Sequence, residues 1–237
     1  MRPFAITHNL GILRDFSHLI FPQKCIACEG ELLRNEDSIC SLCTTNFTET
    51  NFHLSDEATM MDKVFWGRVH IHHTYAHFFF EKEKTAQKIL FQLKYKNNQA
   101  VGNYFGKEMA KRLLMNPSFG DLNVLIPVPL HPKKEFIRGY NQSDAIAKGL
   151  SDGLTLKMDL KSVLRVRHGE SQTKKSRFER WSSIQTTFLV KDSIKQYAHI
   201  ALVDDVITTG STIEVIAKAI LEKHPTVKIS VVTLAIT

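Results

Sequence analysis

The chain has 237 residues, of which 43% are hydrophobic and 23% are charged, with 11 glycines and 7 prolines. This is an ordinary globular composition, so it excludes a disordered, collagen-like or low-complexity chain. The length accommodates one full domain with a small appendage, or two modest domains. No apolar run approaches the ~20 residues that a membrane span needs. The first residues include Arg14 and Asp15 and lack a small-residue cleavage site, so we expect a cytoplasmic protein with no membrane span.

The net charge of +7 is unevenly distributed along the chain. Residues 1–60 contain 4 lysines and arginines against 8 aspartates and glutamates, whereas residues 61–237 contain 27 against 16. The basic character therefore belongs to the larger C-terminal part, where a phosphate-bearing ligand or nucleic acid could bind. A solvated basic surface explains the same imbalance and is the favoured interpretation on charge alone.

All four cysteines lie in two C-x-x-C pairs, Cys25 with Cys28 and Cys40 with Cys43, separated by eleven residues. Two tight turns that each supply two thiolates provide the ligand set of a tetrahedral zinc site. A pair of disulfides is the weaker alternative, because we expect an intracellular chain. We therefore expect a structural Zn²⁺ site in a small zinc-ribbon module of residues 1–60, followed by a larger domain of residues 61–237.

Residues 69–78 are rich in β-branched and aromatic side chains, which is typical of a strand. Such a strand would carry His73 and His77 on one face and His70 and His72 on the other. A second metal site in this stretch is the minority interpretation, because no cysteine or carboxylate is in step with the histidines.

The spacing of apolar residues predicts a helix within 81–95 and a second amphipathic helix after it. Short apolar runs at 123–128, 162–166 and 186–190 predict strands, and a further helical stretch begins at Asn141.

Residues 199–203 form an uninterrupted apolar run, which is typical of a strand buried on both faces of a parallel sheet. Ser211–Lys223 is predicted as a helix, with Ser211 and Glu214 forming a capping box. Lys228–Ile236 is predicted as the last strand. Because strands and helices alternate after residue 120, we expect an α/β fold with a parallel sheet flanked by helices.

Asp204 and Asp205 follow the apolar run directly. Two adjacent carboxylates at the carboxyl end of a strand suit a vicinal diol, because each can accept a hydrogen bond from one hydroxyl. The next residues supply backbone N–H groups, four hydroxyls and a helix N-terminus, which together suit a monophosphate. These residues are Thr208, Thr209, Gly210, Ser211 and Thr212.

Two carboxylates that suit a diol, next to a turn that suits a monophosphate, fit a ribose 5-phosphate. An N-capped helix after a polar turn is the alternative, and it leaves the paired aspartates unexplained. The stretch matches neither G-x-x-x-x-G-K-[ST] nor G-x-G-x-x-G, which excludes the common ATPase and dinucleotide-binding loops.

The segment HIALVDDVITTGST resembles the phosphoribosyl-pyrophosphate (PRPP) signature of type I phosphoribosyltransferases. Other pieces follow in an order similar to the ComF (competence protein F) family, which includes the GntX proteins. These pieces are the cysteine pairs, Leu93-Lys94-Tyr95, PVPLHP at 127–132, RGYNQ at 138–142, and Gln172, Arg180 and Phe188. The resemblance runs from residue 25 to about residue 215. It departs from the family at Ser183, where an asparagine is usual.

The resemblance implies a type I phosphoribosyltransferase-like sheet behind a zinc ribbon. Asp204 and Asp205 would then hold the ribose hydroxyls, and residues 208–212 the 5-phosphate. The loop after residue 128 resembles the pyrophosphate loop, with Pro129, Leu130, His131 and Arg138 as its candidate residues. The basic stretch 161–180 resembles the mobile hood, and its candidates for neutralising the leaving group are Arg165, Arg167, Lys174 and Lys175. Mg²⁺ would accompany PRPP.

Three functional hypotheses follow. The first is an enzyme of DNA uptake and competence that transfers phosphoribose from PRPP to an unidentified nitrogen acceptor. The second is a non-catalytic competence factor that binds PRPP or a nucleotide, or handles single-stranded DNA, as a partner of the DNA-uptake machinery. The third is a zinc-ribbon nucleic-acid binder, which the acidic charge around the ribbon disfavours. Single-stranded DNA, if bound, would favour the basic segments 131–138 and 161–180.

Overall fold

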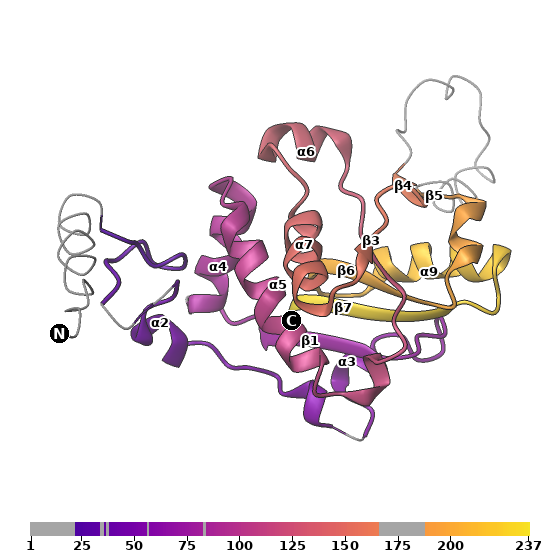
Figure 1. Cartoon of the computed structure of the whole chain (residues 1–237), viewed down its shortest axis with the longest axis horizontal. Helices are drawn as coiled ribbons and strands as arrows, with labels where there is room; N and C mark the ends of the chain where they lie inside the picture. The colour runs from indigo at the N-terminus through magenta and orange to yellow at the C-terminus, as the bar shows by residue number, and fades with distance from the viewer. Residues whose placement is uncertain (1–21, 34–35, 37, 56, 83, 166–187) are drawn as a thin grey trace, which may run out of the picture.

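The computed structural model describes residues 22–33, 36, 38–55, 57–82, 84–165 and 188–237 of the chain. Its centre is a sheet of five parallel strands in the order β1-β7-β6-β2-β3. The strands are Thr74–Phe79 (β1), Val124–Pro127 (β2), Lys157–Met158 (β3), His199–Ile207 (β6) and Lys228–Ile236 (β7). Helices flank this sheet (Figure 1). The predicted α/β class, with a parallel sheet flanked by helices and an N-terminal four-cysteine segment, is confirmed.

The first half of β6 is buried on both sides, as its apolar run predicts. Ala201 and Val203 belong to the core formed with α4, α5 and α7, whereas Ile200 and Leu202 belong to a second core formed with α3 and α9. These helices span Met60–Lys63 (α3), Thr85–Tyr95 (α4), Gln99–Leu113 (α5), Gln142–Leu154 (α7) and Ser211–Lys223 (α9). Because successive strand residues point to opposite faces, one apolar run serves both cores.

Helices α5 and α7 approach each other closely through glycines. A Cβ atom on Gly106 would lie 2.2 Å from the carbonyl oxygen of Ile146, and one on Gly149 would lie 2.1 Å from that of Asn103. No side chain fits at such distances, so only glycine permits this packing. The close contact fixes α7, whose first residues reach the carboxyl end of β6.

The strands predicted near 162–166 and 186–190 form, but they do not join the parallel sheet. Val163–Arg165 (β4) and Phe188–Val190 (β5) pair antiparallel as a separate two-stranded sheet. Lys223 at the end of α9 donates a hydrogen bond to the carbonyl oxygen of Val190 at 2.8 Å, which ties this small sheet to the domain.

The strand predicted over 69–78 begins only at Thr74. The N–H of Val69 still bonds to the carbonyl of Phe65, so the chain turns before it reaches the sheet. His70, His72 and His73 therefore precede β1, and the predicted alternation of histidines between two strand faces is wrong. His77 lies in β1 and is buried, with its Nδ1 2.8 Å from the hydroxyl of Tyr75.

The segment predicted as a loop between Pro129 and Arg138 contains a short helix, Pro132–Arg138 (α6). His131 caps it by accepting a hydrogen bond from the N–H of Lys133 at 3.2 Å, and Gly139 ends it with a φ of 78°. The helix stands away from the sheet above α7 (Figure 1). It buries no residue, so its sequence lacks the apolar periodicity by which a helix is predicted.

Two details around β6 differ from the prediction. The strand continues to Ile207, because β7 extends beside it and pairs with it through the end. Helix α9 has Gly210 as its N-cap, with no capping side chain, so the predicted capping box of Ser211 and Glu214 is wrong. Glu214 instead forms ion pairs with Arg68 and Lys218.

The remaining short elements are α2 (Ser41–Thr45) and three 3₁₀ turns, η1 (Phe52–Leu54), η2 (Pro117–Phe119) and η3 (Asp192–Gln196). Among the helices of the described ranges, none has both the length and the apolar character needed to span a bilayer.

Candidate functional site

The four predicted cysteine ligands lie together. Their four Sγ atoms all lie within 4.8 Å of one another, and those of Cys28 and Cys40 are 3.7 Å apart. The first pair sits in a turn closed by a bond from the N–H of Glu29 to the carbonyl of Cys25, and the second pair begins α2. A tetrahedral zinc ion with Zn–S bonds of about 2.3 Å holds its sulfurs about 3.8 Å apart. The cluster could therefore hold a zinc ion.

The electrostatics of the cluster also suit a cation. Burial acts to raise the pKa of the Cys25 thiol, but backbone N–H groups, those of Cys40 and Cys28 foremost, lower this pKa to about 7. Burial raises the pKa of the Cys43 thiol far above its usual range, and the neighbouring sulfurs raise it further. Four adjacent thiolates repel one another, and a bound divalent ion removes this repulsion as the thiols lose their protons.

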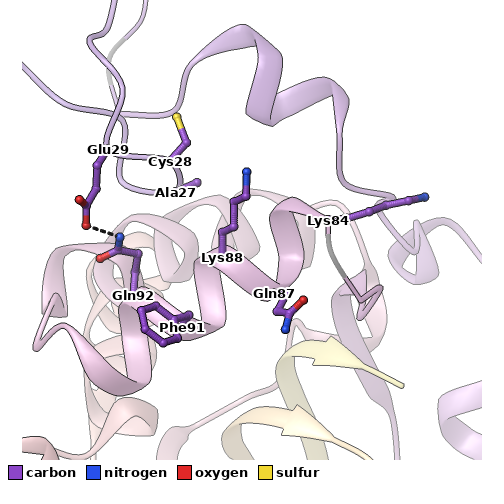
Figure 2. Close-up of a pocket in the computed structure, with 8 residues that line it drawn as sticks. All are labelled: Ala27, Cys28, Glu29, Lys84, Gln87, Lys88, Phe91 and Gln92. Carbon is purple, nitrogen blue, oxygen red and sulfur yellow. Dashed lines mark hydrogen bonds between the residues drawn. The ribbon is translucent and has the colours of Figure 1, made fainter.

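The cysteine segment packs against α4. Cys25 and Cys43 share one apolar core with Ile89 and Leu93 of that helix. A pocket of about 320 Å³ lies between the first cysteine turn and α4. Beside it, the side chain of Gln92 donates a hydrogen bond to Glu29 at 2.6 Å (Figure 2). The side chains that line this pocket are Ala27, Cys28, Glu29, Lys84, Gln87, Lys88, Phe91 and Gln92. Helix α4 thus connects the cysteine segment to the main domain.

The predicted aspartates lie beyond the last pairing of β6 with β2. That pairing ends at Val203, whereas β7 continues alongside, so Asp204 and Asp205 border a gap in the sheet. Asp204 accepts hydrogen bonds from the hydroxyl of Ser143 at 3.1 Å and from the N–H of Asp205 at 2.8 Å. Asp205 forms an ion pair with Lys94 at 3.0 Å. The carboxylates of two adjacent residues therefore lie just beyond the end of β2, and each contacts a different helix.

The two carboxylates have different proton affinities. Burial raises the pKa of Asp204 to about 7, and the adjacent charge of Asp205 adds to the effect. The N–H of Asp205, the hydroxyl of Ser143 and the positive charge of Lys94 partly oppose this rise in pKa. The negative charge of Asp204 acts in turn to raise the pKa of Arg165, at the end of β4. Burial lowers the pKa of Arg165, and its Nε atom is buried without a hydrogen-bond partner in the part of the chain that the structure describes. A guanidinium with an unused donor beside the aspartates fits a role toward an anionic ligand.

The predicted phosphate-binding turn follows β6 and precedes α9. Thr208, Thr209, Ser211 and Thr212 are exposed, and the hydroxyls of Thr209 and Ser211 are 2.8 Å apart. Gly210 has a φ of 70°, and a Cβ atom there would lie 2.7 Å from a methyl of Val64. The glycine is therefore required by packing inside the protein. Four exposed hydroxyls at the N-terminus of a 13-residue helix make a polar turn open to solvent.

Hydrogen bonds hold the segments on either side of α6 at this site. The side chain of Asn141 donates a hydrogen bond to the carbonyl of Val128 at 3.0 Å, and the hydroxyl of Tyr140 donates one to the carbonyl of Leu93. Pro129, Leu130 and His131 are partly exposed at the end of β2. Arg138 reaches back toward α4, where its guanidinium lies 5.9 Å from the centre of the Tyr95 ring. Segments that are distant in sequence thus converge at the carboxyl ends of β2 and β6.

The structure describes only part of the predicted site. Arg165 lies near Asp204, but Arg167, Gln172, Lys174, Lys175, Arg180 and Ser183 lie outside the described residues. Sequence reasoning assigned no role to Lys94 or Ser143, although each contacts one of the aspartates. Lys94 could have been suspected from the Leu93-Lys94-Tyr95 motif, whereas Ser143 at the start of α7 carries no signal in the sequence.

These features define an α/β protein with a four-cysteine cluster that could hold a zinc ion and a polar site at the carboxyl ends of its parallel strands. Competence protein F of Haemophilus influenzae is 29% identical to this chain over 215 residues, which are 84% of the chain and 90% of the relative. DNA utilization protein YhgH of Escherichia coli K12 is 25% identical over 218 residues, 86% of the chain and 92% of the relative.

Competence protein ComFC of Bacillus subtilis is 33% identical over 111 residues, 47% of the chain and 43% of the relative. No family model matches the chain. These relatives confirm the resemblance to the ComF family that the motifs indicate, and their names support a role linked to competence and DNA utilization.

Proposed function

We propose that the chain binds PRPP together with Mg²⁺ and transfers its phosphoribosyl group to a nitrogen acceptor, in a process linked to DNA uptake. The observation that carries this proposal is the pair of carboxylates, Asp204 and Asp205, next to the hydroxyl-rich turn 208–212. The carboxylates suit the two ribose hydroxyls, and the turn suits the 5-phosphate. Both belong to one continuous segment, from the end of β6 to the start of α9.

The same geometry suggests how the residues would act. The anomeric carbon–oxygen bond breaks with oxocarbenium character, pyrophosphate departs with the bonding electrons, and the acceptor nitrogen forms the new bond. Such a reaction depends on positioning and charge neutralisation. Lys94 pairs with Asp205 and Arg165 interacts electrostatically with Asp204, so we assign both cations to the pyrophosphate. Mg²⁺ would neutralise further charge between the ribose hydroxyls and the pyrophosphate.

Binding would rearrange one contact. Asp205 is paired with Lys94, and both side chains are mostly buried, with 13% and 20% exposed. Ligand hydroxyls would replace Lys94 at the carboxylate, while the ammonium group moves to the pyrophosphate. Each charge would then exchange one partner for another, so neither would be left unpaired in a buried place.

The direct test is incubation with PRPP and Mg²⁺, with pyrophosphate release measured with and without nucleobases, ammonium or amines. We expect release that an acceptor stimulates and that Arg165→Met slows. If the protein binds PRPP but releases no pyrophosphate with any acceptor, the hypothesis of a non-catalytic competence factor would be favoured instead.

A single-stranded DNA-handling role is the second candidate. The exposed side chains of Tyr95 and Phe136 stand near Lys133, Lys134 and Arg138. Aromatic faces among basic residues suit stacked bases on a phosphate backbone. Salt-dependent binding of single-stranded oligonucleotides that Phe136→Ala weakens would support this role, and salt-independent or absent binding would exclude it.

We also propose that the four cysteines hold a structural Zn²⁺, and that residues 1–60 form the module around it while residues 61–237 form the phosphoribosyltransferase-like domain. We propose that the protein acts in the cytoplasm.

A further inference from the structure

The turn 208–212 rests on the segment that follows α3. A Cβ atom on Gly210 would lie 2.7 Å from a methyl of Val64 and 2.9 Å from the ring of Phe65, so the protein itself fills this side of the turn. Phe65 is buried in the core formed with α3 and α9. A ligand must therefore approach the turn from its opposite side, where the hydroxyl-bearing side chains are exposed.

Arg68, in the same segment, holds the turn by its backbone. Its Nη1 atom donates hydrogen bonds to the carbonyl oxygens of Thr209 at 2.6 Å and of Val64 at 2.9 Å. Its Nε atom donates to the carboxylate of Glu214 at 2.9 Å, and its Nη2 atom forms an ion pair with the same oxygen. Glu214 lies in the first turn of α9. One planar guanidinium thus joins the segment after α3 to the turn 208–212 and to α9.

The bond to Thr209 fixes the direction of the next amide. The peptide bond between Thr209 and Gly210 is trans, so its C=O and N–H groups point in opposite directions. Because the carbonyl is turned toward Arg68, the N–H of Gly210 points away from the segment after α3 and toward the open side. Gly210 is the N-cap of α9, so this N–H adds a donor at the helix end where an anion is favoured.

Glycine makes this orientation easy to lose. A flip of the peptide group changes chiefly the ψ of Thr209 and the φ of Gly210, and glycine accepts both signs of φ, so the backbone itself opposes the flip only weakly. In the flipped turn the carbonyl oxygen of Thr209 would face the ligand, and its partial negative charge would repel a phosphate. The bond from Arg68 opposes this flip.

We infer that Arg68 is a positioning residue for the phosphate end of PRPP: it holds the peptide group between Thr209 and Gly210 so that the N–H of Gly210 donates a hydrogen bond to the 5-phosphate. This inference rests on the proposed function. Arg68 acts through this peptide group and not by contact with the phosphate, since its charge is already paired with Glu214.

The inference is tested by comparing Arg68→Met with Lys218→Met. Each variant removes one cation that pairs with Glu214, but only Arg68 also bonds to the carbonyl of Thr209. Calorimetry measures the binding of PRPP with Mg²⁺ and of pyrophosphate with Mg²⁺. We expect Arg68→Met to weaken PRPP binding about tenfold, the worth of one hydrogen bond to a charged group, and to leave pyrophosphate binding within about twofold of wild type. Lys218→Met should bind both as wild type does.

NMR follows the amide itself. Thr209 and Gly210 form the one Thr-Gly pair in the sequence, so carbonyl-labelled threonine combined with ¹⁵N-glycine selects a single amide signal. In wild-type protein, saturation with PRPP and Mg²⁺ should move the Gly210 proton signal downfield, as a new hydrogen bond to a charged group does. Arg68→Met saturated with the same ligand should lack this shift.

A Gly210 signal that PRPP leaves in place in wild-type protein would overturn the role of Arg68 while the proposed function stands, and it decides the matter even if Arg68→Met does not fold. PRPP binding by Arg68→Met as tight as by Lys218→Met, or equal weakening of PRPP and pyrophosphate binding, would overturn it as well. Failure of wild-type protein to bind PRPP would overturn the proposed function, and the role of Arg68 with it.

Discussion

At the scale of single residues, the site depends on what surrounds the two aspartates. The adjacent carboxylates could be predicted because they are neighbours in the sequence and follow an apolar run. Their partners could not be predicted, because Lys94 and Ser143 are far from them along the chain and meet them only through the packing of α4 and α7. The same limit applies to Gly210. The sequence placed it in the phosphate-binding turn, and only the structure shows that a Cβ atom there would lie 2.7 Å from a methyl of Val64.

Asp204 should make stability depend on pH. Its pKa is about 7 in the folded protein, against 3.8 as its ordinary value, mainly because of burial. The folded state therefore binds this proton more tightly than the unfolded state, so stability is present at low pH and is lost as the pH rises from about 4 to about 7. Asp204→Asn removes this loss, and its stability relative to wild type should increase across that window.

Urea unfolding at pH 4.5, 6 and 7.5 measures this difference, with the exposed Asp192→Asn as control. If the free energies of unfolding of Asp204→Asn and wild type differed by the same amount at all three pH values, the Asp204 carboxylate would not be buried as the structure indicates.

At the scale of elements, strongly patterned helices and strands could be predicted and weakly patterned ones could not. The predicted bounds of α9 and β7 agree with the structure, because each carries a continuous apolar face. Helix α6 was missed because Phe136 and Ile137 point to solvent, with 90% and 81% of their surfaces exposed. Only its end signals, Pro132 at the start and Gly139 after the end, mark it in the sequence.

The contact between α5 and α7 gives a prediction at this scale. Gly149→Ala would place a methyl group on the backbone of Asn103, so the helices must separate. We expect a loss of roughly 1–3 kcal/mol in the free energy of unfolding, the usual cost of overpacking. Since α7 carries Ser143, affinity for PRPP should fall as well.

Thermal and urea unfolding measure this loss. Gly120→Ala is the control, because its added Cβ would meet only the carbonyl oxygen of Pro117, at 3.2 Å. If Gly149→Ala were as stable as Gly120→Ala, the two helices would not pack as closely as described.

At the scale of the whole molecule, the alternation of strands and helices predicted the class of fold, but not the placement of every strand. Periodicity shows that a segment is extended and buried, and it does not show which segment it pairs with. β4 and β5 were therefore predicted as strands, and their separate antiparallel sheet was not. The strand β3 has only two residues, too few to give a pattern.

The cysteine segment gives a whole-molecule prediction, because it shares a core with α4. One zinc ion per chain should be found by metal analysis, and Cys40→Ser or a strong chelator should release it. Loss of the ion should expose residues 22–46 to proteolysis while the parallel sheet stays folded, since metal binding contributes to the folding free energy of the small module. Wild-type protein without zinc, or with four thiols that react at the rate of free cysteine, would contradict this.

The central claim is that Asp204, Asp205 and the turn 208–212 bind PRPP, and calorimetric titration of PRPP with Mg²⁺ tests it most directly. Asp204→Asn/Asp205→Asn should weaken binding by at least about tenfold, because a hydrogen bond to a charged group is worth roughly 1.5–3 kcal/mol. Glu108→Gln, which changes a partly exposed carboxylate on α5 that pairs with Lys111, should bind as wild type does. Equal affinity of the double variant and wild type, or no binding of PRPP by folded wild-type protein, would contradict the account.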